Sequence, residues 1–226
     1  MKYSYVGYEV CPSGKFTPSL LLAGMCVGRC SRIVGWSLVP MSVLSMLINT
    51  LLLFPDLKAR FLLEGHVTPE ATWSTGIWAS GFLVLVAARS FISNSLQRSC
   101  CGFRIEMMWQ IGTSAIAVVA AGICFLISSA GLACGPLCLH NSTEGLTWDQ
   151  PLKKLIRRGS PYFPIQAWQT LTCEEPSGVV PWNAVLFSVL MATSGIQVLL
   201  CATQTLNALL GMLCGQGFCR NKVSPA

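Results

Sequence analysis

The chain has 226 residues, which is an ordinary length for a single domain. It is 53% hydrophobic and only 11% charged, whereas soluble domains are roughly 25% charged, and its apolar residues come in long blocks. The formal net charge is +6, but the basic residues gather beside these blocks, a pattern typical of membrane flanks that disfavours nucleic acid as a partner. A protein embedded in the lipid bilayer is therefore expected.

Residues 1–32 are expected to form a cytoplasmic tail. The short apolar piece at 20–27 is similar to the apolar region of a signal peptide. It has no small-residue cleavage site, and Arg29 and Arg32 follow it at once. A tail is therefore favoured over a signal peptide.

Three membrane spans are predicted next, because about 20 apolar residues suffice to cross the hydrocarbon core as a helix. They are 33–54, 73–92 and 108–133. A short outer loop at 55–72 joins the first span to the second, and a cytoplasmic loop at 93–107 joins the second to the third.

Small residues in two of these spans are spaced so that helix backbones can approach closely. Gly76 and Ser80 form such a pair in the second span. Thr113, Ala117 and Ala121 repeat every four residues in the third. Both faces are expected to contact neighbouring helices.

The fourth span is predicted at 182–214, followed by a short tail at 215–226. The span has no charged residue but carries several amide side chains, which are costly if they face lipid. We expect these amides, with one in the first span, to form hydrogen bonds between helices. They are Asn49, Gln197, Gln204 and Asn207. The alternative is that they line a wet path across the membrane.

The long connection at 134–181 is expected to form a small outer domain. It contains three cysteines and one glycosylation sequon, which begins at Asn141. With four spans, the two tails and the 93–107 loop lie on one side, and together with Arg89 at the adjoining end of the second span they hold nine of the 15 basic residues. Basic residues mark the cytoplasmic side, so both termini are predicted inside and the long connection outside.

Six cysteines lie at the predicted cytoplasmic ends of three different spans. They are Cys26, Cys30, Cys100, Cys101, Cys214 and Cys219. Thiols in this position are candidates for palmitoylation, and unmodified thiols are the alternative. A zinc site is disfavoured because no paired CxxC spacing recurs and no histidine is nearby.

An enzyme is not expected, and no catalytic residue, metal site or cofactor is predicted. The chain has only two histidines, His66 and His140, both on the outer side. A nucleophilic pair of Cys138 and His140 is conceivable, but a disulfide-bonded Cys138 is favoured. No phosphate-binding glycine loop and no paired intramembrane carboxylates are present in the sequence, so nothing supports a proton-driven carrier.

Several short motifs are spread over residues 25–221. They are Met25-Cys-Val-Gly-Arg-Cys-Ser-Arg, Asn49 before Phe54-Pro55, Cys100-Cys101-Gly102, Gly135-Pro136-Leu137-Cys138, Trp168 with Cys173-Glu174-Glu175-Pro176, Val180-Pro181-Trp182-Asn183 and Leu186-Phe187-Ser188. Together they resemble the L-six branch of the transmembrane-four superfamily, the tetraspanin-like surface antigens. True tetraspanins carry their Cys-Cys-Gly motif in the large outer loop, and claudins carry two cysteines in the first loop.

The resemblance implies a four-span adaptor that gathers other integral membrane proteins, namely integrins, receptors or transporters. It implies palmitoylated membrane-proximal cysteines, a glycan on the second outer loop, and the plasma membrane, with endosomal or lysosomal membrane as the alternative location. A second copy of the chain is a further candidate partner. The alternative function is a small channel or an accessory subunit of a transporter or pump. The chain departs from the family pattern at residues 1–24, at Asn183, which is not followed by a sequon, and at the additional Cys134.

A disulfide between Cys138 and Cys173 is predicted, because both lie in the oxidising outer compartment. Cys134 competes for Cys173, but it is expected at the membrane end of the third span. The turn at Gly135-Pro136 frees Cys138 to cross the loop. The predicted fold class is therefore all-α, a four-helix transmembrane bundle with a small disulfide-linked extracellular loop domain.

Overall fold

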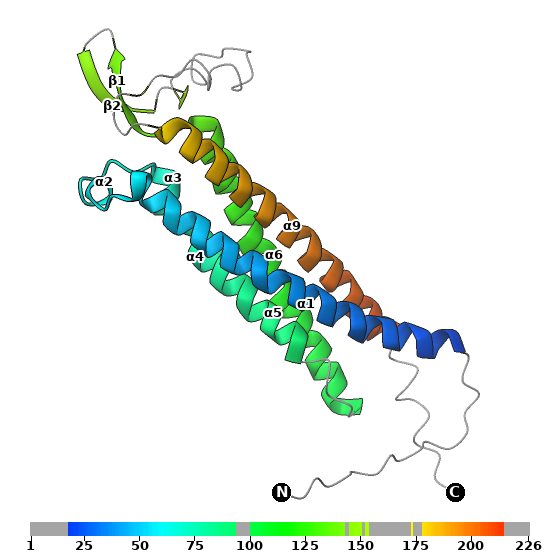
Figure 1. Cartoon of the computed structure of the whole chain (residues 1–226). Coiled ribbons are helices and arrows are strands. Elements are labelled where there is room, and N and C mark those ends of the chain that lie inside the picture. The colour runs from blue at the N-terminus through cyan, green and yellow to red at the C-terminus, as the bar shows by residue number, and fades with distance from the viewer. Residues whose placement is uncertain are drawn as a thin grey trace, which may run out of the picture.

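The structure is a computed structural model of the whole chain. It describes the backbone of residues 18–93, 100–142, 145–150, 152–153, 173 and 178–214. Side chains are described for 30–93, 108–140, 145–150, 152–153, 173 and 178–210. Within these residues, four helical segments are long and apolar enough to cross a membrane, and they pack into one elongated bundle (Figure 1). They are Cys30–Leu53, Thr75–Ser93, Met108–Cys134 and Val179–Leu210.

The first helix, α1, runs from Pro18 to Leu53 and thus begins well before the apolar block. Proline is well placed at its start, because the first amides of a helix have no partner within the helix. The helix stops before Pro55, which begins the short 3-10 turn η1 (Pro55–Leu57). Asp56 and Leu57 in this turn have positive φ angles, so the chain bends sharply as it leaves α1.

The short loop after α1 contains two one-turn helices, α2 (Arg60–Leu63) and α3 (Pro69–Thr72). The second membrane helix follows as three consecutive pieces. They are α4 (Thr75–Ile77), the π-helical η2 (Trp78–Leu83) and α5 (Val84–Ser93). A π-helical turn widens the helix locally and shifts the face that follows it.

The remaining elements are two long helices and a β hairpin between them. Helix α6 spans Cys100–Cys134 and α9 spans Val179–Cys214. Strands β1 (Cys138–Ser142) and β2 (Gly145–Asp149) pair antiparallel. Figure 1 shows this hairpin at one end of the bundle, here called the hairpin end, whereas α1 begins and α9 finishes at the opposite end.

Three of the four membrane helices bury side chains at alternating spacings of three and four residues. This heptad spacing keeps one seam facing the neighbouring helices of a left-handed bundle. The seam residues are Ser31, Gly35, Leu38, Ser42, Ser45, Asn49 and Leu52 in α1; Gln110, Ser114, Ala117, Ala121, Cys124, Ser128 and Gly131 in α6; and Asn183, Phe187, Leu190, Ser194, Gln197, Cys201, Gln204 and Ala208 in α9. Most of them are small or polar, as expected where helices associate in lipid.

The third span corrects one detail of the packing predicted from sequence. Ala117 and Ala121 are fully buried, as predicted, but Thr113 is only partly buried and bonds to its own helix at Trp109 O. Ser114 occupies the seam instead. A strict four-residue repeat turns away from one face of a 3.6-residue helix, whereas alternating steps of three and four follow it.

Two apolar clusters fill the bundle, one on either side of a polar layer. The cluster nearer the hairpin end includes Ile48, Leu52, Phe187 and Leu190. The buried members of the other cluster are Leu38, Val84, Ala87, Ala88, Phe91, Ala117, Ala121 and Cys201. The polar residues between them form the first part of the candidate site.

Candidate functional site

Four polar side chains from three membrane helices meet between the apolar clusters. We call Ser45, Ser80, Thr193 and Gln197 the polar hub. Ser80 Oγ donates to Gln197 Oε1 at 2.6 Å, and Gln197 Nε2 donates to the Ser80 carbonyl at 3.1 Å. Ser45 Oγ lies 3.0 Å from Ser80 Oγ and 3.4 Å from Thr193 Oγ1. The hub therefore links α1 and α9 through the π-helical turn that carries Ser80.

A second polar contact joins α1 to the start of the second membrane helix. Asn49 Oδ1 accepts a hydrogen bond from the Gly76 amide at 2.8 Å, and Asn49 Nδ2 donates to Ala71 O at 3.3 Å. A Cβ added at Gly76 would lie 2.7 Å from Asn49 Cβ. Only glycine permits this close approach, which explains the small-residue pair seen in the sequence.

Further polar contacts lie toward the opposite end of the bundle. Gln204 Nε2 donates to Ser31 Oγ at 3.0 Å, and Ser31 Oγ donates to Phe91 O at 3.3 Å. Ser114 Oγ in α6 donates to Cys201 O in α9 at 2.8 Å. Asn207 is only half-buried and lies beside the α9 seam. Three of the four predicted amides thus lie in the interior and bond to other helices, whereas Asn207 lies at its margin.

The burial of these amides distinguishes packing from a wet path. Gln197 is 0% exposed, Gln204 is 1% exposed and Asn49 is 2% exposed. Their hydrogen-bond partners are hydroxyls, carbonyls and an amide of other segments of the chain. Among the described residues, Gln204 Oε1 has no hydrogen-bond partner. The arrangement therefore fits interhelical hydrogen bonding.

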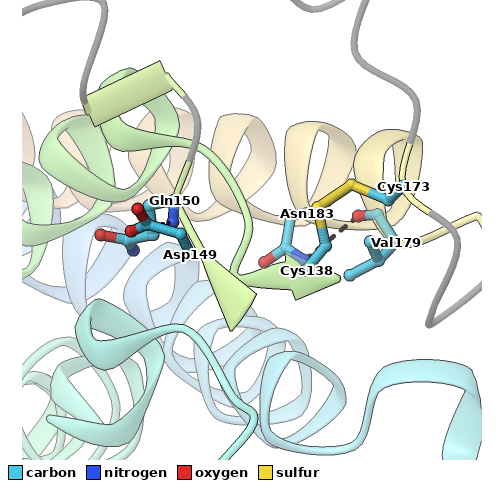
Figure 2. Close-up of a disulfide and its surroundings, with 6 residues drawn as sticks. All are labelled: Cys138, Asp149, Gln150, Cys173, Val179 and Asn183. Atoms are coloured by element: carbon cyan, nitrogen blue, oxygen red, sulfur yellow. Dashed lines mark hydrogen bonds between the residues drawn. A yellow bond between two sulfur atoms is a disulfide. The ribbon is translucent and has the colours of Figure 1, made fainter. Parts of the chain in front are cut away.

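The second part of the site is the hairpin end, where a disulfide joins Cys138 of β1 to Cys173. Their Cα atoms are 5.8 Å apart, and the bond closes a segment of 35 residues. This is the pairing predicted from the sequence, and Cys134 is a free, half-buried thiol at the end of α6. Figure 2 shows the disulfide together with Asn183 and Val179 of the first turns of α9.

The short outer loop packs against the hairpin and against α9 through three contacts. The His66 and Trp148 rings stack with centroids 3.9 Å apart and planes 2° apart. Gln150 Nε2 donates to Glu70 Oε2 at 3.1 Å. Thr68 Oγ1 donates to Asn183 Oδ1 at 3.3 Å. These contacts, with the disulfide, form what we call the outer joint.

Charged groups at the outer joint lie at its surface. Arg60 Nε donates to Glu64 Oε1 at 2.7 Å, and Glu64 Oε2 lies 3.4 Å from His66 Nδ1. The hydrogen bond from Arg60 is the largest cause that lowers the pKa of Glu64 below its usual value. Glu64 is therefore ionised at neutral pH. Its ion pair with Arg60 is exposed, so the pair contributes little to stability.

The family of the chain follows from its sequence matches. A family model described as L6 membrane protein matches residues 25–218, which include all four candidate membrane spans and all of α1 except its first seven residues. The chain belongs to the L6 membrane protein family. This family is the L6 branch of the tetraspanin-like superfamily, as the motifs predicted.

Individual L6 proteins match over nearly their whole length. Transmembrane 4 L6 family member 1 of Homo sapiens is 33% identical, covering 86% of this chain and 96% of the relative. Member 4 of Mus musculus is 36% identical, covering 84% of this chain and 93% of the relative. Member 5 of Bos taurus is 36% identical, covering 88% of this chain and 97% of the relative. No solved structure gives a significant match.

Several predicted features of this L6 protein fall outside the described side chains. Cys26, Cys100, Cys101, Cys214 and Cys219 are among them, whereas Cys30 is described and exposed. Asn141 lies in β1 opposite Leu146, but its side chain is outside the described set. Within the described residues, no three His, Cys, Asp or Glu side chains gather in a metal-binding arrangement.

The structure also settles the chemistry of one candidate nucleophile. Cys138 is bonded to Cys173, so its sulfur is not a thiolate that His140 could activate. Asn183 is buried and uses both ends of its amide, donating to Val179 O and accepting from Thr68. Sequence reasoning missed this last contact, although the position of Asn183 at the start of a span was a signal for it.

Proposed function

We propose that this L6 protein is a non-enzymatic membrane adaptor that associates laterally with other integral membrane proteins, such as integrins, receptors or transporters. The observation that carries this proposal is the filled interior of the bundle. Its buried amides are used to hold the helices together, so the surfaces offered to other molecules are the lateral faces and the outer joint. Such an adaptor affects adhesion, signalling or trafficking by bringing partner proteins together, and not by catalysing a reaction.

The lateral faces support this role because they are apolar and their hydroxyl groups are bonded within their own helices. Thr50 Oγ1 donates to Met46 O and Ser188 Oγ donates to Ala184 O, which leaves an apolar surface for lipid or for another helix. Exposed side chains such as Trp36, Phe82 and Leu199 lie on this surface. Apolar faces of this kind suit contacts with other membrane helices, including those of a second copy of the chain.

The test of the proposed function is proximity labelling from the protein in its native cells, followed by purification in mild detergent. We expect a set of integral membrane proteins that are labelled and then co-purify with it. As the matched measurement, the purified protein in planar bilayers should show no conductance of its own. A reproducible single-channel conductance, with no co-purifying membrane protein, would support the channel alternative.

We propose that both termini are cytoplasmic, that the hairpin end is extracellular and that Asn141 carries a glycan. The support is the excess of basic residues on the side of the termini and the disulfide at the hairpin end, since disulfides persist outside the cytosol. The wild-type protein should shift once on glycosidase treatment, and an Asn141→Gln variant should not. A shift that persists in the variant contradicts both the site and the orientation.

We propose that the six cysteines at the predicted cytoplasmic ends of the spans, opposite the hairpin end, are palmitoylated. We also propose that the protein resides in the plasma membrane. The position of these cysteines beside the spans supports palmitoylation, and Cys30 is exposed at that end. Acyl–biotin exchange should label the wild type and lose most of its signal when all six are changed to serine. Equal labelling of that variant would rule the assignment out.

A further inference from the structure

Two arginines lie on the lateral surface near the opposite end from the hairpin, on neighbouring helices. Arg32 is in α1 and Arg89 is in α5, and both side chains are exposed. Within the part of the chain that the structure describes, neither forms an ion pair or a side-chain hydrogen bond. An arginine facing lipid needs a counter-ion, because a charge in or near hydrocarbon is costly.

The packing of α1 on α5 places these two arginines at related positions. The helices touch where a Cβ added at Gly35 would lie 2.8 Å from Ile92 Cγ1. Arg32 precedes Gly35 by three residues, and Arg89 precedes Ile92 by three. Because the two helices run in opposite directions, the arginine backbones are separated along the bundle axis by about 9 Å, at 1.5 Å per residue.

The side of each helix that carries the arginine is the side that borders the neighbouring helix. In α1, Arg32 shares a heptad position with Met46, whose side chain lies against Gly81 of the second membrane helix. In α5, Arg89 lies on the same side as Ile92, three residues on, which contacts α1. The two guanidinium groups thus flank the line along which α1 meets α5.

We propose that Arg32 and Arg89 bind the headgroup of one anionic phospholipid in the cytoplasmic leaflet. Arg89 lies deeper in the membrane, at the level where its long side chain can reach the phosphodiester. Arg32 lies farther toward water, where a second acidic group of a polyanionic headgroup extends. Guanidinium groups bind phosphate oxygens through paired hydrogen bonds, and basic sites between membrane helices are suited to inositol phospholipids.

An aromatic side chain completes the site. Trp36 is exposed on α1, one turn from Arg32 and on the same face. Tryptophan favours the boundary between headgroups and hydrocarbon, so it marks the depth at which a glycerol backbone would lie. The assignment to the cytoplasmic leaflet rests on the proposed orientation of the chain, whereas the binding itself does not.

The test is native mass spectrometry of the purified full-length protein in detergent, with phosphatidylinositol 4-phosphate or phosphatidylcholine added. The wild type should retain the phosphoinositide and not phosphatidylcholine. Binding should weaken roughly fivefold in Arg32→Gln or Arg89→Gln and about 25-fold in the double variant, since each arginine contributes about equally near an anionic surface. An Arg32→Lys/Arg89→Lys variant should bind more weakly than the wild type but more tightly than the double glutamine variant, because lysine keeps the charge and loses the paired hydrogen bonds.

The matched control removes two exposed positive charges at the hairpin end, in an Arg60→Gln/Lys153→Gln variant, and should bind like the wild type. Equal binding by the Arg32→Gln/Arg89→Gln variant, or equal retention of phosphatidylcholine by the wild type, would overturn the proposal. So would equal affinity for soluble inositol phosphate and for the phosphoinositide, since the site would then recognise a free phosphate rather than a lipid. A detergent micelle has no cytoplasmic or outer leaflet, so this binding measurement does not depend on the proposed orientation of the chain. A negative result would therefore count against lipid binding and not against the orientation.

Discussion

The bundle interior and the outer joint hold the same chain together by different means. In the interior, neutral hydroxyls and amides of distant helices bond to one another in near-complete burial, as Ser80 and Gln197 do. At the outer joint, a covalent bond between Cys138 and Cys173 is accompanied by a ring stack and by exposed ion pairs. The difference follows from the solvent around each region.

Lipid offers no competing hydrogen bonds, so a polar side chain inside the bundle is best satisfied by another helix. Water competes for the charged groups at the outer joint, and pairs such as Arg60 with Glu64 add little there. A short hairpin in water is also marginal on its own. The outer joint therefore depends on its disulfide, whereas the interior depends on many small contacts.

The largest expected effect is the loss of the disulfide. A Cys173→Ser variant should lose about 3–4 kcal/mol of stability at the hairpin end, because the denatured segment is no longer closed. The bundle should keep its helices. Circular dichroism together with limited proteolysis within strands β1 and β2 would show intact helices and a hairpin that has become cleavable.

A Cys134→Ser variant is the control for this experiment, since Cys134 is a free thiol in the same region. It should resist proteolysis like the wild type. If the two variants are equally cleavable, or if peptide mapping finds Cys134 bonded to Cys173, the outer joint is not organised as described.

A Gly76→Ala substitution should have the next largest effect, and it acts on the interior alone. The added methyl would lie 2.7 Å from Asn49 Cβ and 3.0 Å from Ser45 O, so α1 must move away from the second membrane helix. We expect a loss of about 1–3 kcal/mol, measured by SDS-induced unfolding.

Gly122→Ala is the matched control, because a Cβ there meets nothing within 4 Å. It should be neutral or should stabilise α6 by up to ~1 kcal/mol, since alanine favours a helix more than glycine does. Equal losses for the two alanine variants would contradict the close packing at Gly76.

Replacing Gln197 by leucine should have a smaller effect on the interior. It removes two hydrogen bonds to Ser80 while keeping the volume of the side chain nearly unchanged. At about 0.6 kcal/mol for each hydrogen bond in a membrane protein, the expected loss is about 1–2 kcal/mol. Thr203→Val is the comparison, because that exposed hydroxyl bonds only to Leu200 O of its own helix and should change little.

The smallest effect concerns pH at the outer joint. The lowered pKa of Glu64 means that its pairing with Arg60 is fully present above the unfolded value of 4.5 and is lost as pH falls through the lower folded value. Unfolding midpoints of the wild type and of Glu64→Gln should therefore differ slightly at pH 7 and converge below pH 4.5. A difference that grows on acidification would contradict the assignment.

Much of this architecture could be predicted from the sequence because the signals are strong. An uncharged apolar block as long as the fourth span indicates a membrane helix, and amides at a seven-residue spacing identify the face of α9 that is buried. The pairing of Cys138 with Cys173 followed from the Gly135-Pro136 turn and the compartment of the loop. Each of these arguments depends on local sequence and on the solvent.

The parts that could not be predicted depend on contacts between distant segments. Nothing near Ser80 in the sequence indicates a π-helical turn, and nothing near His66 indicates that it stacks on Trp148. Ser45 and Thr193 resemble ordinary hydroxyls of a span until their helices are placed side by side. Such contacts can be identified only when the packing of the helices is known.

The central claim is that the interior is a closed, packed seam, and two native cysteines can test it directly. Cys124 in α6 and Cys201 in α9 are both 0% exposed. A small hydrophilic methanethiosulfonate reagent should leave both unmodified in the folded protein, while a Leu146→Cys substitution on the exposed hairpin reacts and unfolding in SDS releases all three. Peptide mass spectrometry that finds Cys124 or Cys201 modified at the rate of the hairpin cysteine would show a water-filled path and contradict the account.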